Sequence, residues 1–443
     1  MTEFDQSTKW RSSFRHLAEF RHSSSLPTGR LSLKADSNRV DRREIMVCKI
    51  LWKREFGRFD FFIVQALLTT CGGWHLSHTA KAFEARGSLA GLWLTDRCRN
   101  GLPPEKVRRC WPFQIAMQPF FRLAPQIIIE RVFYALFPAW KAWLVSQTYP
   151  ECDVIQAIVG YGTEPFDQAD KTGALKVVDC PNSHPLSYHG FWQRECDLWC
   201  SGEKVPIPRW MFARMNRELE RADLIIVQSK FCQESMVYNG IPAGKVMINP
   251  MGVDTVIFKK RETVPEKVRF ITVGTICLRK GHQYLFRAFA MVKEKLPEAE
   301  LICVGQYKTD FRIERSKWEG TFTHYPSLTH AELAALLTTC TAFVFPSQEE
   351  GIARAQIEAM AAGLPLIGTH EGGATTLVND GCEGLIAHGR DPAHIAEAMM
   401  KTATDRELNQ RMGDAAYLKG AKQNTWQDYG DRLLGEYARR MEK

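Results

Sequence analysis

The stretch that decides the fold is residues 343–389, FVFPSQEEGIARAQIEAMAAGLPLIGTHEGGATTLVNDGCEGLIAHG. An apolar run typical of a buried strand stops at Pro346. A helical pattern then follows between Gly351 and Gly363, and Pro365 prevents the helix from continuing. A strand end that leads into a helix N-terminus leaves free amide donors beside the positive end of the helix dipole. The segment therefore predicts a binding site for an anionic group such as a phosphate.

Two glutamates frame this predicted helix, Glu350 before it and Glu358 within it. At the helical rise of ~1.5 Å per residue, their spacing along the chain would place them about 12 Å apart. This separation is too large for two carboxylates that share a proton. It is comparable to the distance from the sugar to the ribose of a nucleotide-diphosphate sugar, so the pair is a candidate for holding both ends of such a molecule.

The residues around the two glutamates resemble a known motif. The segment PSQEEGIARAQIEAMAAGLPLIGTHEGG, residues 346–373, is similar to the E-x7-E region of retaining GT-B glycosyltransferases, particularly those of family 4. The segment DGCEGLI, residues 380–386, is similar to the end of the same region. The resemblance implies an α/β fold in which two Rossmann-like, doubly wound domains face each other across a cleft.

Two series of apolar runs agree with this fold, one between residues 63 and 253 and one between residues 269 and 388. Runs that are apolar throughout are typical of strands buried on both faces of a parallel sheet, and their spacing leaves room for helices. The charged segment at 254–268 reads as a linker between the two series. The expected parts are a flexible N-terminal extension (1–45), an N-terminal acceptor-binding domain (46–256), a C-terminal nucleotide-sugar-binding domain (266–424) and a helix that returns to the N-terminal domain (425–443).

Two basic residues lie at another predicted strand end. The segment VGTICLRKGH, residues 273–282, resembles the family's strand and loop that close in Lys-Gly, although Thr275 stands where many members have Arg. Arg279 and Lys280 would supply positive charge to a diphosphate leaving group, with Arg279 compensating for the departure at Thr275. The alternative is that both are solvated charges on a loop.

The N-terminal half shows weaker similarity to the family. The segment at 71–87 resembles a Gly-Gly turn after the first strand, in which Gly72 and Gly73 would let the backbone approach a ligand closely. The alternative is a tight structural turn. The loop VVDCPNSHP at 177–185 resembles the one that presents a histidine, here His184, near the donor sugar. The alternative is a loop histidine bonded to the backbone.

The resemblance also implies residue roles. Glu350 and His184 would be the catalytic residues, with Glu350 contacting the donor sugar near the reacting carbon. Glu358 would accept hydrogen bonds from the ribose, and the departing phosphate oxygen would take the acceptor's proton. No metal or other cofactor is implied, because the nucleotide-diphosphate sugar is a co-substrate. The expected donor-binding residues are Arg279, Lys280, Glu358, Gly351, Ile352, Ala353, Gly72 and Gly73.

The expected function is transfer of a hexose, with retention, from a nucleotide-diphosphate sugar to a glycan or lipid-linked saccharide in polysaccharide biosynthesis. Two alternatives remain at this point: a catalytically inactive GT-B partner subunit, and a GT-B phosphorylase or epimerase. A nucleic-acid partner is not expected, because no recognition motif accompanies the net charge of +8.

The composition is that of a soluble globular chain, with 45% hydrophobic and 24% charged residues. Thirteen cysteines without a C-x-x-C pair favour a reducing compartment, and the N-terminus lacks a signal-peptide pattern, so we expect a cytoplasmic protein. Cys180, His189, Cys196 and Cys200 do not have the spacing of a standard zinc site. His75 and His78 lack an acidic or thiol partner in a motif, and packing roles are expected for them.

Residues 107–147 interleave aromatic and aliphatic residues with arginine and lysine. Amphipathic helices of this kind can lie in a membrane interface, with their basic side on anionic head groups. We therefore expect a peripheral site at the inner face of the plasma membrane. The alternative is an ordinary helical insertion packed on the first sheet.

Overall fold

The structure, a computed structural model, describes residues 63–72, 75–95, 101–123, 126–199, 201–205 and 207–442. The predicted extension at 1–45 and the predicted start of the N-terminal domain at residue 46 lie outside the described residues. Gly73 and Cys200 lie outside them as well.

The first half of the described chain forms a parallel sheet with helices on both faces. Its strands are β1 (Ala66–Thr70), β2 (Leu89–Leu94), β3 (Val107–Arg109), β4 (Val154–Ile158), β5 (Leu175–Cys180), β6 (Leu224–Val227) and β7 (Val246–Ile248). Its helices are α3 (Leu76–Ala85), α4 (Trp111–Leu123), α5 (Gln126–Ser146), α6 (Thr163–Thr172), α8 (Arg209–Arg221), α9 (Lys230–Tyr238) and the short 3₁₀ helices η2 (Pro104–Lys106) and η3 (Ala243–Lys245).

Both faces of this sheet are buried, which explains why its strands are apolar throughout. In β1, Leu67 joins a core that includes residues of α4, α5, α6, α8 and α9. The neighbouring Ala66 and Leu68 point the other way and join a second core with residues of α3. Successive side chains of a strand face opposite sides of the sheet, so one short run supplies both cores.

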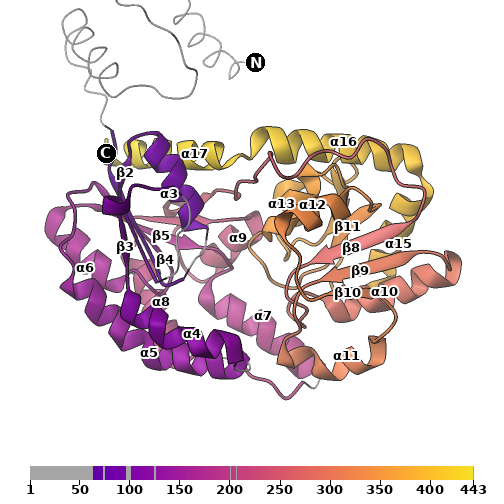
Figure 1. Cartoon of the computed structure of the whole chain (residues 1–443), viewed down its shortest axis with the longest axis horizontal. Helices are drawn as coiled ribbons and strands as arrows, with labels where there is room; N and C mark the ends of the chain where they lie inside the picture. The colour runs from indigo at the N-terminus through magenta and orange to yellow at the C-terminus, as the bar shows by residue number, and fades with distance from the viewer. Residues whose placement is uncertain are drawn as a thin grey trace, which may run out of the picture. The chain divides into compact units, whose positions relative to one another are not determined.

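The second half repeats this design. Its strands are β8 (Arg269–Val273), β9 (Glu300–Val304), β10 (Thr323–Tyr325), β11 (Ala342–Phe345), β12 (Leu366–Gly368) and β13 (Gly384–Ile386). Its helices are α10 (His282–Lys295), α11 (Arg312–Trp318), α12 (His330–Leu337), α13 (Arg354–Ala361), α14 (Ala374–Leu377), α15 (Pro392–Thr404), α16 (Arg406–Gln423) and the 3₁₀ helix η4 (Thr309–Phe311). Figure 1 shows the two sheets as separate lobes of the described chain.

Strand order confirms the predicted doubly wound topology. The first sheet runs β3-β2-β1-β4-β5-β6-β7 and the second runs β10-β9-β8-β11-β12-β13, and every pair within them is parallel. In each sheet the order reverses once, between β1 and β4 and between β8 and β11. Ligands of open α/β sheets bind in the crevice at the carboxyl ends of the strands at such a reversal.

One helix of the first half belongs to the core of the second. This is α7 (Pro185–Leu198), whose buried Trp192 packs with residues of the second sheet and donates a hydrogen bond from Nε1 to Asp310 Oδ2 at 3.0 Å. The fully buried Glu195 accepts hydrogen bonds from the Tyr284 hydroxyl at 2.9 Å and from Arg390 Nε at 2.8 Å. The two lobes are therefore joined by side-chain contacts, and the domain boundaries expected from the sequence remain a prediction.

The chain ends with α17 (Trp426–Met441), which begins directly after its capping residue Thr425 and packs on α3 (Figure 1). The Tyr429 hydroxyl donates to Asp179 Oδ2 at 3.4 Å, within the core of the first lobe. The same carboxylate oxygen bonds His75 Nε2 at 2.8 Å, and both residues are buried. His75 is therefore more than a packing residue, because it pairs with Asp179 at the carboxyl end of β5.

The 107–147 region begins with the strand β3, and its helices α4 and α5 pack on the first sheet through buried side chains such as Phe113 and Trp140. The same helices leave Trp111 49% and Ile115 65% exposed. Packing on the sheet thus explains the apolar residues on the buried side of these helices, but it does not explain the exposed Trp111 and Ile115. Among the helices that the structure describes, none has both the length and the apolar composition needed to span a membrane.

Candidate active site

The candidate site lies at the crevice between β8 and β11, where two loops meet. One loop follows β8 and ends at Gly281, and the other follows β11 and begins at Pro346. A Cβ atom on Gly281 would lie 2.0 Å from the Pro346 carbonyl oxygen, and its φ of +74° is a conformation that other residues rarely adopt. This glycine therefore lets the loop with Arg279 and Lys280 touch the loop with Glu350.

The helix after the second loop begins later than the sequence suggests. It starts at Arg354 rather than directly after Gly351, because residues 351–353 are not helical. The separation of about 12 Å between Glu350 and Glu358 assumed helical rise along the whole segment. Only the part from Arg354 onward is helical, so that value does not hold. The Ala353 amide donates to Gln356 Oε1 at 2.9 Å, whereas the Ile352 amide has no partner within the part of the chain that the structure describes.

Glu350 lies between the two predicted cations. Its Oε2 atom is 3.0 Å from Lys280 Nζ and 3.4 Å from Arg279 Nη1. The side chains of both cations are only 13% exposed, so the alternative of solvated loop charges is wrong. Burial alone would raise the pKa of Glu350, but Lys280 and Arg279 together hold it below its ordinary value. Glu350 is therefore ionised at neutral pH.

The preceding residue, Glu349, was not predicted and is completely buried. Its Oε2 atom accepts a hydrogen bond from Arg279 Nη1 at 2.7 Å, and its Oε1 atom accepts from Ser183 N at 3.0 Å and from Ser183 Oγ at 2.8 Å. Burial raises the pKa of Glu349 although Arg279 opposes this rise. The residue falls at an unspecified position of the E-x7-E region, so no sequence signal distinguished it from a surface glutamate.

Arg279 is held along one edge of its guanidinium group. Nη1 donates to the carbonyl and the carboxylate of Glu349, while Cζ lies 5.3 Å from the centre of the Tyr188 ring. Within the described ranges, Nε and Nη2 have no hydrogen-bond partner. One edge of the group is thus fixed by the protein, and the other remains available to a ligand.

His184 lies in the opposing lobe at the start of α7. Its Nδ1 atom accepts a hydrogen bond from Leu186 N at 3.3 Å, and its own amide donates to Ser235 Oγ at 2.9 Å. Burial lowers the pKa of His184 to about 4. The imidazole is therefore neutral at physiological pH, with its proton on Nε2, because Nδ1 acts as an acceptor. The alternative of a histidine bonded to the backbone is therefore correct for Nδ1, which accepts from the Leu186 amide. Nε2 remains a donor for a ligand.

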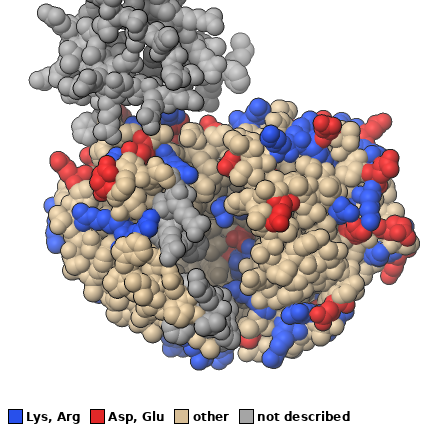
Figure 2. Space-filling view, viewed as in Figure 1, with Lys and Arg blue, Asp and Glu red and all other residues tan. Residues whose placement is uncertain are grey.

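The two lobes touch at a glycine. A Cβ atom on Gly351 would lie 1.9 Å from the carbonyl oxygen of Pro181, in the loop that leads to His184. This contact sets the Glu350 loop directly against the His184 loop. Figure 2 shows a hollow between the lobes on this face, with acidic and basic side chains on its walls.

The other predicted residues lie apart from this cluster along the chain. Glu358 is partly buried in α13, and burial raises its pKa although Arg354 and His330 act in the opposite direction. Gly72 follows β1 at a φ of +122°, which only glycine adopts readily, while Gly73 is outside the described residues. His78 stacks on Trp426 with ring centres 4.4 Å apart.

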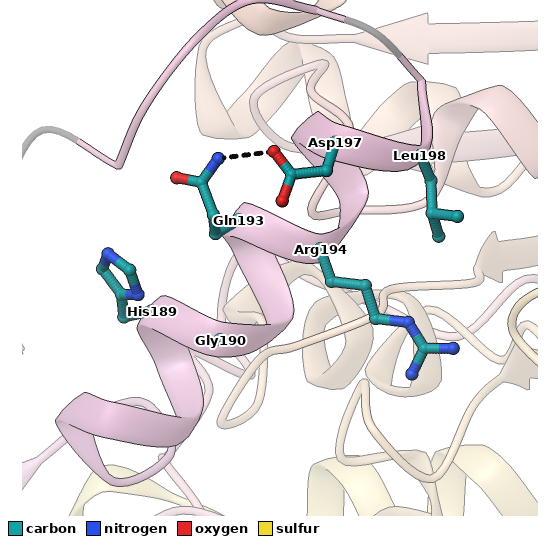
Figure 3. A pocket seen from close by; sticks show the side chains of 6 residues that line it. All are labelled: His189, Gly190, Gln193, Arg194, Asp197 and Leu198. Atoms are coloured by element: carbon teal, nitrogen blue, oxygen red, sulfur yellow. Dashed lines mark hydrogen bonds between the residues drawn. The ribbon is translucent and has the colours of Figure 1, made fainter.

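A second concavity, of about 500 Å³, lies along the exposed side of α7 (Figure 3). Gln193 Nε2 donates to Asp197 Oδ1 at 2.9 Å along the helix, and a Cβ atom on Gly190 would meet nothing within 4 Å. The lining residues are His189, Gly190, Gln193, Arg194, Asp197 and Leu198.

Solved structures resemble the described chain over most of its length. Sucrose-phosphate synthase from Thermosynechococcus elongatus superposes with a TM-score of 0.62 at 18% identity, covering 85% of this chain and 99% of that protein. HepE from Anabaena, solved with UDP and glucose, superposes with a TM-score of 0.59 at 17% identity, again over 85% and 99%. At these identities the likeness concerns the fold.

A D-inositol 3-phosphate glycosyltransferase from Stackebrandtia nassauensis is 27% identical over 266 residues, which make up 54% of this chain and 59% of that protein. The chain spans less than two thirds of the length of the curated relatives it matches.

The two doubly wound sheets and the crevice between β8 and β11 define a protein of the GT-B glycosyltransferase fold. Residues 253–419, which contain the Lys280 loop and both glutamates of the E-x7-E region, match the model of the glycosyl transferases group 1.

Proposed function

We propose that the chain is a retaining glycosyltransferase of the family 4 type that transfers a hexose from a nucleotide-diphosphate sugar to a saccharide or lipid-linked saccharide in polysaccharide biosynthesis. The observation that carries the proposal is the ion cluster in which Glu350 lies within 3.4 Å of both Arg279 and Lys280 at the β8–β11 crevice. A catalytically inactive partner subunit would not need to keep these charges together in a crevice.

The charges of this cluster suggest how a donor binds. When Glu349 is ionised like Glu350, the two carboxylates balance the two cations Arg279 and Lys280, so the cluster has no net charge to offer a diphosphate. Donor binding therefore requires Lys280 to leave Glu350 for the diphosphate. Glu350 then turns to hydroxyl groups of the sugar, near the carbon where the bond breaks.

Departure of the nucleoside diphosphate develops negative charge on its β-phosphate. The free edge of Arg279 and the Lys280 ammonium would stabilise that charge, so the proposed reaction does not depend on a divalent cation. His184 Nε2 donates a hydrogen bond to the sugar from the opposing lobe. The departing phosphate oxygen takes the proton of the acceptor, which enters on the same side and preserves the anomeric configuration.

A panel of UDP-, GDP-, ADP- and dTDP-sugars, scored by thermal shift, tests donor use. We expect one donor to stabilise the protein, and Glu358→Ala to weaken its binding about 10- to 30-fold, because a carboxylate that accepts two ribose hydrogen bonds contributes roughly 2 kcal/mol. Transfer with that donor should persist in EDTA and give a product of retained configuration by NMR.

Other outcomes of the panel would reject the proposal. Turnover that requires inorganic phosphate and no nucleotide sugar would identify a phosphorylase. Interconversion of the sugar without transfer would identify an epimerase, and donor binding without turnover would identify an inactive subunit.

The exposed side of α4 supports a second part of the proposal, a cytoplasmic protein at the anionic inner face of the plasma membrane. Trp111 and Ile115 are exposed on this helix, and Cζ of Arg109 in β3 lies 5.5 Å from the centre of the Trp111 ring. Arg131 and Lys141 of the neighbouring α5 are exposed as well. Aromatic and aliphatic side chains beside basic ones fit an anionic lipid surface, and a lipid-linked acceptor would be found there.

Flotation with vesicles of phosphatidylcholine and phosphatidylglycerol at low salt tests this surface. We expect the wild-type chain to float, and the double change Trp111→Ser and Ile115→Ser to reduce binding about tenfold or more, because two large apolar side chains no longer enter the interface. Val256→Ser is the matched control, since Val256 is 79% exposed and lies in the segment between the sheets. A wild-type chain that stays wholly in the soluble fraction would contradict this part of the proposal.

A further inference from the structure

Glu349 connects the two lobes at the candidate site, and no motif assigns it a role. It is fully buried, and each oxygen of its carboxylate faces a different lobe. Oε1 accepts two hydrogen bonds from Ser183 in the first lobe, and Oε2 accepts one from Arg279 in the second. A buried carboxylate is stable only when its oxygens are satisfied in this way.

This carboxylate fixes the direction in which Arg279 presents its donors. Nη1 is bound to the Glu349 carboxylate at 2.7 Å and to the Glu349 carbonyl oxygen at 2.5 Å, and the ring of Tyr188 lies across the guanidinium plane. A planar group held at one nitrogen and on one face has little freedom to rotate. Its Nε and Nη2 edge, without a partner among the described residues, is therefore the edge that faces a bound anion.

The same carboxylate fixes the loop that carries His184. Ser183 donates both its amide and its hydroxyl to Glu349, and the next residue along the chain is His184. The backbone of this loop also meets Gly351 through Pro181. A continuous chain of contacts thus runs from Arg279 through Glu349 and Ser183 to His184.

We infer that Glu349 is a positioning residue that sets the spacing between the cation for the leaving group and the histidine for the donor sugar. The inference rests on the proposed function, because it assigns Arg279 to the diphosphate and His184 to the sugar. Glu349 touches neither substrate, and it acts through Arg279 and Ser183. Chemistry that depends on two groups from different lobes requires such a connection, because displacements near 1 Å can cost about 100-fold in rate.

A double-mutant cycle on kcat tests the inference. Glu349→Gln preserves the shape of the side chain, but an amide cannot accept hydrogen bonds from both Ser183 and Arg279 as a carboxylate does. We expect kcat to fall about 20-fold, while KM for the donor changes less than about threefold. Arg279→Ala should lower kcat about 100-fold. If Glu349 acts through Arg279, the double variant should be no slower than Arg279→Ala alone, whereas independent structural effects would multiply to roughly 2,000-fold.

Two further variants separate positioning from folding. Ser183→Ala keeps the amide donor and loses the hydroxyl donor, so a smaller fall in kcat, about threefold, is expected from a change that the fold tolerates easily. Glu195→Gln is the matched control. Glu195 is also a fully buried carboxylate that joins α7 to the second lobe, but it contacts Arg390 and Tyr284 instead of Arg279. Glu195→Gln should lower the unfolding temperature and leave kcat within about threefold.

Each outcome decides between these ideas. Suppose that the wild-type chain transfers sugar. An unchanged kcat in Glu349→Gln, or losses that multiply in the double variant, would then overturn the inference and leave the proposed function intact. A wild-type chain that transfers sugar from no donor would overturn the proposed function and the inference with it.

Discussion

Replacing Glu350 by glutamine should lower kcat for sugar transfer about 1,000-fold while tightening the binding of the free nucleoside diphosphate about fivefold. The first effect follows because the carboxylate is proposed to act on the donor sugar where positive charge develops. The second follows because Lys280, 3.0 Å from Glu350 Oε2, no longer has to leave a carboxylate in order to bind a phosphate. A partly buried ion pair contributes about 1 kcal/mol, which corresponds to the fivefold change. Steady-state kinetics and calorimetry with the nucleoside diphosphate measure the two effects separately.

The opposite signs of these two effects make the experiment specific. A variant that merely unfolds would lose catalysis and binding together. Glu371→Gln removes a carboxylate close to the same loop, since the Glu371 carbonyl oxygen accepts the Glu350 amide at 2.9 Å, and it should change neither quantity by more than about twofold. Weaker nucleotide binding in Glu350→Gln would show that Lys280 does not exchange partners.

Replacing Gly351 by alanine should lower kcat/KM at least about 100-fold and destabilise the fold by about 1–3 kcal/mol. The new methyl group would lie 1.9 Å from the Pro181 carbonyl oxygen, which is backbone and cannot rotate away, so the two loops must separate. Separation moves Glu350 away from the loop of His184, and misplacement on this scale costs about 100-fold in rate. Kinetics together with urea unfolding measure both effects.

The matched control is Gly435→Ala in α17. A Cβ atom at Gly435 would meet nothing within 4 Å, and alanine is the better helix former, so this change should leave kcat/KM unaltered and stabilise the protein by up to about 1 kcal/mol. Full activity in Gly351→Ala would show that the contact with Pro181 is not needed for catalysis.

The sequence predicted the fold well because the evidence for it is local. Apolar runs such as those of β1 and β5 are set by burial on both faces of a sheet, and that requirement is visible in a few consecutive residues. The short edge strand β10 was missed, because its three residues THY are not apolar and their exposure leaves no pattern. The start of α13 was misplaced, because the side chain of Gln356 caps the helix at Ala353 and this choice depends on the surrounding loop.

The candidate site was predictable only where one segment contains the whole pattern. Glu350 and Lys280 were found from their own loops, but their pairing needed the structure. Glu349 could not be found, because its partner Ser183 lies 166 positions away in the chain. His75 was given a packing role for the same reason, since its partner Asp179 is 104 positions away.

The attachment of α7 to the second lobe limits how a product can escape. A hinge confined to the segment between the sheets would require α7 to slide off a surface where Trp192 and Glu195 are buried and hydrogen-bonded. It is less costly for α7 to travel with the second lobe, so that bending occurs where this helix joins the rest of the first lobe. The residues on either side of α7, rather than the charged linker, would then govern the rate of turnover.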